Sequence, residues 1–223
     1  IEISDFGPSH PNPNYQTNMK HIVIPTIAIL SSAAAVFAAP QTFDFKDPKG
    51  VNHAKFTLDA PLESISGVAN GVSGTLTVDP EKPEATSGTI TVATSSLHVE
   101  NPVMKEHMLG ADWLDAGKNP EITFTVKSLK DYAMKDGKAS ATVVGTFMLK
   151  GVEKEISVPA TVTLLPGKLA DRSGGKLKGD LAVIRTSFTL KRSDFGINPK
   201  ASEDKVSDEI AVSLSIAGAS PQG

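Results

Sequence analysis

Apolar and polar residues alternate along most of the chain from Phe43 onward. In seven segments every second residue is apolar, and Thr, Ser, Lys or Glu fills most positions between. These segments are TLTVD, TITVAT, EITFTVKS, ATVVGTFMLKG, EISVPATVTLL, residues 184–190 and residues 210–216. A period of two places the apolar side chains on one face of a strand and the polar ones on the other. Seven or eight such strands predict an all-β protein, either an antiparallel barrel or a sandwich.

Turn-forming residues separate these segments. Asp136-Gly137 suits a tight hairpin because both residues tolerate positive φ. Gly151 separates two strands that can pair as neighbours. The stretch 165–179 is predicted to be a long flexible connection, and the glycines of residues 67–74 indicate a bend or bulge in a curved strand.

Residues 102–116 break the alternation and predict a short helical flap. Asn101 is a suitable N-cap, Pro102 suits the first helical position, and Gly110 suits the end of the helix. The segment holds two of the five methionines and the only tryptophan. Such a composition is typical of a soft apolar flap beside one end of a barrel.

The first forty residues have the features of an export signal. Met19 opens a short basic start, and residues 22–36 form an uncharged apolar run that is followed by small residues. This pattern predicts a cleavable signal peptide over residues 19–39 and the folded domain over residues 40–223. Residues 1–18 are polar and are expected to be an upstream extension that is not native to the protein.

Composition narrows the classes of function. The net charge is −3 and the basic residues are scattered, so neither nucleic acid nor an anionic membrane is indicated as a partner by charge. There is no cysteine, which removes thiolate metal sites and cysteine nucleophiles. The histidines His53, His98 and His107 form no metal-binding spacing, so no metal or other cofactor is expected.

Two strings resemble catalytic motifs, but their contexts do not fit. Asp194-Phe195-Gly196 matches the magnesium tripeptide of protein kinases, although no glycine-rich nucleotide loop or His-Arg-Asp loop accompanies it. No G-x-S-x-G elbow occurs, and the acidic residues lie beside turns or on predicted outer faces. We therefore expect no enzyme. An enzyme acting on a lipid through His107 is kept as a weaker hypothesis.

Five segments in order along residues 43–217 resemble the YceI-like, polyisoprenoid-binding proteins. They are TSSLHVE, HMLGADWLDAGKNPEITF, GTFMLKGVEKEISVP, FTLKRSDFGIN and KVSDEIAVSLSI. The resemblance implies a lipocalin-like barrel of about eight strands in the periplasm. It also implies a long isoprenoid-type lipid in the interior, such as a polyprenyl chain, an isoprenoid quinone or a fatty amide. A homodimer and a transient contact with a membrane or membrane protein are further implied partners.

In this barrel, residues 191–196 are expected to be the end of a strand and its turn. Alternation then assigns one set of side chains to the interior wall, namely Phe56, Leu76, Ile90, Ile122, Phe124, Phe147, Leu149, Ile184, Phe188, Leu190 and Phe195. The flap is expected to border an opening with a second set, namely Met104, His107, Met108, Leu109 and Trp113. The alternative function is a ligand-free structural or stress-protective barrel whose own side chains fill the interior.

Overall fold

The computed structural model describes residues 40–135 and 137–222. Residues 1–39 lie outside this part, so the upstream extension and the signal peptide stay predictions. Asp136, half of the predicted hairpin turn, also lies outside it. In the described part, no helix is both long and apolar enough to cross a bilayer.

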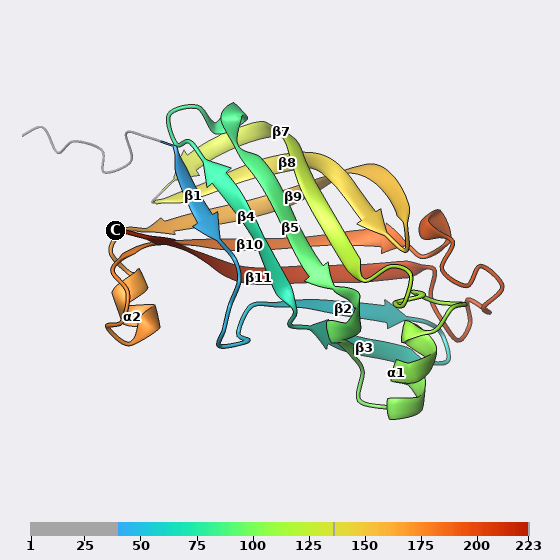
Figure 1. The fold of residues 1–223 in the computed structure, drawn as a ribbon. Helices are drawn as coiled ribbons and strands as arrows, with labels where there is room; N and C mark the ends of the chain where they lie inside the picture. Colours follow the sequence, from blue (N-terminus) through green and yellow to red (C-terminus); the bar gives the residue numbers. More distant parts are fainter. Residues whose placement is uncertain (1–39, 136, 223) are drawn as a thin grey trace, which may run out of the picture. The chain divides into compact units, whose positions relative to one another are not determined.

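Eleven strands, two α-helices and three short 3-10 helices make up the described fold (Figure 1). In chain order they are β1 Gln41–Asp44, β2 His53–Asp59, β3 Ser64–Ala69, β4 Val72–Val78, η1 Pro83–Ala85, β5 Ser87–Ala93, η2 Thr94–Ser96, β6 Leu97–His98, α1 Pro102–Leu109, β7 Glu121–Lys135, β8 Lys138–Leu149, β9 Val152–Leu165, α2 Leu169–Ser173, β10 Gly179–Lys191, η3 Ser193–Phe195 and β11 Glu209–Pro221.

The strands form one antiparallel sheet that closes on itself. Eight of them follow one another in the ring β1-β4-β5-β7-β8-β9-β10-β11, and β1 returns to β11 through the pair Asp44–Ala219. Strand β2 pairs with the same edge of β11 as β1, along residues 211–215, and β3 and β6 continue the sheet from β2. The lipocalin-like barrel predicted from the alternation and the resemblance is therefore confirmed, and the sandwich is excluded.

The predicted flap begins as expected. The Asn101 side chain accepts hydrogen bonds from the backbone N–H groups of Val103 and Met104, at 3.0 and 3.1 Å, which caps α1. The helix ends at Leu109, and residues 110–118 continue as turns rather than helix.

Two connections differ from a simple loop. The glycine-rich stretch contains the junction of β3 and β4, where only Asn70 and Gly71 separate two strands that do not pair with each other. The stretch 165–179 is not a flexible connection throughout, because it includes α2, whose Leu169 is 3% exposed. Gly174 ends this helix with φ +66°.

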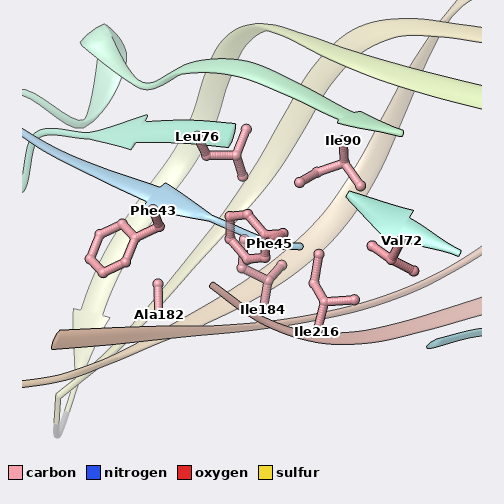
Figure 2. Packing of buried hydrophobic residues seen from close by; sticks show 8 residues of the cluster. All are labelled: Phe43, Phe45, Val72, Leu76, Ile90, Ala182, Ile184 and Ile216. Atoms are coloured by element: carbon pink, nitrogen blue, oxygen red, sulfur yellow. The ribbon is translucent and has the colours of Figure 1, made fainter. Parts of the chain in front are cut away.

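Two buried aromatic side chains anchor the segment that begins with β1. Phe43 and Phe45 are almost fully buried. Figure 2 shows them between Leu76 and Ile90 on one side and the β10 and β11 side chains on the other. Full burial of a phenylalanine contributes about 1.5–3 kcal/mol, so these two rings anchor the short β1 in the ring of strands.

The wall between β9 and β10 is only partly hydrogen-bonded. Pairing runs from Leu181–Leu165 to Thr186–Ala160 and then stops, whereas β9 remains paired with β8 and β10 with β11. The short helix η3 packs beside this separation. Its Asp194 forms an ion pair with Lys154 of β9 at 2.8 Å.

Candidate functional site

An apolar cavity of about 460 Å³ lies inside the barrel. Its wall consists of the inward side chains of the ring strands and of β2 and β3, and α1 contributes at one end. Fourteen of the sixteen residues predicted for the site line it, namely Phe56, Leu76, Ile90, Met104, His107, Met108, Trp113, Ile122, Phe124, Phe147, Leu149, Ile184, Phe188 and Leu190. Whether any of them contacts a ligand stays a prediction.

The other two predicted residues, Leu109 and Phe195, do not line the cavity. Leu109 packs on the hydrophobic cluster beside α1. Phe195 is 1% exposed and lies behind the wall, where its ring meets the Phe147 ring edge-to-face at 5.7 Å. It was assigned to the wall as an inward-packing residue of the turn after the strand, and it is buried there in η3, but it does not reach the cavity.

Aromatic side chains form the middle of the wall. The rings of Phe147 and Phe188 meet edge-to-face with centroids 6.2 Å apart, and Phe124 pairs with Phe147 across β7 and β8. Edge-to-face contacts add about 0.5–1.5 kcal/mol beyond the area that the rings bury. These rings therefore give the cavity a firm apolar surface.

Small side chains keep the cavity open at another level. Ala141, Ala160 and Thr186 lie side by side on β8, β9 and β10, and all three line the cavity. None of the three was predicted as a wall residue, although Ala141 and Thr186 share the parity of the predicted wall residues on their strands. Their position next to the large rings means that the interior is not filled by its own side chains.

The flap end of the cavity is held by backbone contacts. The N–H of Leu114 donates to the carbonyl of Met108 at 3.1 Å, and Leu114 itself is 7% exposed and lines the cavity. Trp113 lies with its ring 6.0 Å from the guanidinium carbon of Arg192. Leu114 was missed by the sequence analysis, which expected only its neighbours at this opening.

Besides Asp79, which is 9% exposed, Arg192 is a charged side chain with little exposure on the cavity wall, at 2% exposed. Its guanidinium donates to the carbonyl of Ile197 at 2.7 Å and also to the carbonyl of Asn198. These donations join the end of β10 to the loop before β11. The charged guanidinium thus hydrogen-bonds to the backbone of this corner.

The same corner explains the Asp-Phe-Gly string. Gly196 adopts φ +61° after η3, and Asp194 pairs with Lys154. Burial alone raises the pKa of the neighbouring Asp208. The hydroxyl and backbone N–H of Ser193 outweigh burial, with help from Arg192, and hold that pKa below its ordinary value. The string is a structural corner of the barrel, as the sequence analysis expected.

The opposite end of the cavity was not predicted at all. The β4–β5 connection lines it with Asp79, Pro80 and Pro83, and the end of β7 adds Tyr132 and Met134. The sequence analysis assigned no site residue to this region.

A second hollow, of about 660 Å³, lies across the outer face of β8 to β11 and β2. His53, Lys55 and Arg185 border it together with Ser and Thr side chains of neighbouring strands. Its polar border makes it unsuited to an apolar ligand.

Chemistry-bearing groups do not converge in the described part of the chain. No three His, Asp or Glu side chains within residues 40–135 and 137–222 lie close enough together to hold a metal ion. His107 is exposed at the flap. Its backbone carbonyl accepts a hydrogen bond from the N–H of Gly110 at 3.0 Å.

A closed antiparallel barrel with an apolar interior cavity places this chain among the barrel proteins whose interior has room for a small ligand. Comparison with protein families shows which family of such barrels it belongs to. Residues 34–217 match the YceI-like domain, and the chain therefore belongs to the YceI-like family.

Relatives and solved structures agree with this assignment. A UPF0312 protein of Pseudomonas paraeruginosa is 31% identical over 198 residues, which cover 86% of this chain and 96% of the relative. The Campylobacter jejuni YceI protein has a TM-score of 0.59 at 24% identity, with 74% of this chain and 90% of that one covered. A polyisoprenoid-binding domain from Saccharophagus degradans, implicated in plant cell wall breakdown, has a TM-score of 0.58 at 14% identity, with 82% and 100% covered. These structural likenesses establish the shared fold.

Proposed function

We propose that this protein binds one long apolar lipid inside the barrel and does so in the periplasm. The observation that carries the proposal is the cavity wall, which is apolar from the flap end to the β7–β8 end. An apolar interior offers few hydrogen-bond partners to water or to a polar ligand.

The energetics favour a slender hydrocarbon. Each CH₂ group moved from water into an apolar interior contributes roughly 0.8 kcal/mol, so a long chain needs few polar anchors. A polyprenyl chain, an isoprenoid quinone and a fatty amide all have this form. The polyisoprenoid-binding neighbour from Saccharophagus degradans supports the isoprenoid type.

Binding without chemistry fits the side chains better than catalysis does. In the described part, the wall hydroxyls of Ser140 and Thr186 donate to backbone carbonyls and not to a histidine or carboxylate. None of the five ion pairs of the described residues involves His107. The open volume of about 460 Å³ also favours a container over a ligand-free barrel filled by its own side chains. The periplasmic site of action is supported by the apolar run of residues 22–36.

The proposal is tested by filling the cavity. Ala160→Trp places a large ring at the level of Ala141 and Thr186, and it should lower the affinity for a fluorescent polyprenyl probe by about tenfold or more. The matched control is Thr161→Trp, which adds the same ring at the next residue, whose side chain is exposed on the outer face. Equal affinities of the two variants and the unmodified protein would show that the probe does not use the interior.

A further inference from the structure

Two large apolar side chains of the cavity wall are also exposed on the outer surface. Seven large hydrophobic side chains are exposed in the described part of the chain, namely Val51, Leu62, Val68, Val103, Tyr132, Met134 and Leu177. Of these, Tyr132 and Met134 are also part of the cavity wall. They are 38% and 50% exposed, so each belongs both to the interior and to the surface.

Two irregularities in β7 bring these side chains to that position. The pairing with β8 shifts by one residue between Val126 and Ser128, and again between Lys130 and Ala133. Each shift is a bulge, which changes the residues that face inward. Asp131 occupies the second bulge with φ +54°. As a result Leu129, Tyr132 and Met134 all face the cavity although their numbers do not share one parity.

The place lies far from the flap. Strand β7 begins just after the α1 flap and runs for 15 residues, or roughly 45 Å, before it turns into β8. Figure 1 shows the β7–β8 turn at the opposite end of the barrel from α1. Pro80 and Pro83 of the β4–β5 connection face it across the cavity mouth, and η1 contacts β7.

The surrounding residues suit the boundary between water and lipid. Lys130, Lys135 and Lys138 are exposed beside the two apolar side chains. Lysine can lay its hydrocarbon stem on an apolar surface while its ammonium stays in water, and tyrosine has both an apolar ring and a polar tip. Asp131 and Glu84 are also exposed here, so the lysines do not make the region strongly basic. The attraction would therefore come mainly from apolar insertion.

We propose that residues 129–135 and 137–139, the hairpin tip, dock on the surface of a phospholipid bilayer, with Tyr132 and Met134 inserted at headgroup level. The lipid then passes between bilayer and cavity along a continuous apolar path. A bilayer is the occupant that fits because the cavity wall itself continues into the exposed surface, and a lipid leaving there would otherwise meet water. This inference rests on the proposed lipid-binding function.

The protein is purified after export and without added probe. Its binding to vesicles of phosphatidylethanolamine and phosphatidylglycerol is then measured by flotation. The variant Tyr132→Ser/Met134→Ser should lower vesicle binding by about tenfold or more, because two inserted apolar groups are lost. The control Leu62→Ser/Val103→Ser removes two exposed apolar side chains that do not line the cavity. It should bind vesicles as the unmodified protein does.

Three results would overturn the docking of the hairpin tip. They are no vesicle binding by the unmodified protein, equal loss in both variants, and loss in the control variant alone. Transfer of a dansyl-farnesyl probe from donor vesicles to the protein should slow in the tip variant and not in the control. If the unmodified protein binds vesicles but takes up no probe in detergent-free solution, the lipid-binding function fails while the docking surface stands.

Discussion

At the residue scale, a buried group of polar side chains fixes the segment between β1 and β2. Asn52 is 2% exposed and donates to the carbonyls of Phe45 and Ala217, at 2.9 and 3.0 Å, while its own oxygen accepts from the N–H of Ala217 at 2.9 Å. Each of these bonds satisfies a backbone group that would otherwise be buried without a partner. Asn52 thus ties the β1 segment to β11, where the ring of strands closes.

Asp47 supports the same group from the loop. Its carboxylate accepts from the N–H groups of Val51 and Asn52, both at 2.8 Å, and from Arg172 at 3.0 Å. Burial by itself raises the pKa of Asp47. The backbone donors and Arg172 outweigh burial and leave the pKa below its ordinary value.

This shift predicts how stability depends on pH. A carboxyl group whose pKa is lower in the folded chain stabilises the fold above its unfolded pKa of about 3.9, and the stabilisation is lost as pH falls through the folded value. Asp47→Asn should lower the free energy of unfolding by about 2 kcal/mol at neutral pH. Between neutral pH and pH ~3 the variant should then lose less stability than the unmodified protein loses over the same range. Urea unfolding from pH 7 to pH 3 measures both quantities.

The control for this prediction is Asp59→Asn, which removes the same charge from an exposed residue. It should leave the neutral-pH stability within about 0.5 kcal/mol. If Asp47→Asn is no more destabilising than Asp59→Asn, the polar group around Asn52 does not depend on the carboxylate.

At the element scale, the alternation of apolar residues was enough to predict the strands but not their irregularities. Strand β8 pairs with β9, and β11 with β10, without a register shift, so strict period two placed Phe147, Leu149 and the inward residues of β11 correctly on one face. Strand β7 carries two bulges, and the inward Leu129 between them breaks the parity of Ile122 and Phe124, which returns only beyond the second bulge. Tyr132 and Met134 were missed because the alternation is interrupted after Val126.

The end of β10 shows a different limit of sequence reasoning. The alternation ends at Leu190, and nothing in the sequence beyond it shows that Phe195 lies in the short helix η3 and packs on Phe147 without lining the cavity. Helix α2 was missed because five residues carry too little periodicity to be recognised. The resemblance to a family predicted the barrel but could not locate these local features.

Close approach of β4 to β5 leads to a prediction about Gly74. It has φ +108°, and a Cβ placed on it would lie 2.2 Å from the carbonyl oxygen of Thr89. Gly74→Ala should therefore destabilise the fold by about 3 kcal/mol or more, because backbone would have to move. Thermal and urea unfolding measure the loss.

Gly117→Ala is the matched control for this substitution. A Cβ there would meet nothing within 4 Å, and Gly117 has no positive φ. The substitution should change stability by less than about 0.5 kcal/mol. A Gly74→Ala protein as stable as the Gly117→Ala protein would contradict the close packing of β4 on β5.

At the scale of the whole molecule, the barrel is a rigid wall around a space that its own residues leave open. The ring of eight strands closes through β1, and the flap and the β4–β5 connection border the two ends. Large rings and small side chains alternate around the wall, which gives a slender cavity rather than a filled core. This arrangement needs no catalytic group in order to act, because sequestration of apolar surface from water is itself the source of affinity.

The most direct test of this account is mass spectrometry of the organic extract of the protein purified natively from a periplasm. We predict about one lipid per chain, with a prenyl chain, a quinone or a fatty amide as its apolar part. Its amount should fall in the Ala160→Trp variant. An extract without lipid, from a protein that also fails to bind added isoprenoids, would contradict the account and favour a ligand-free structural barrel.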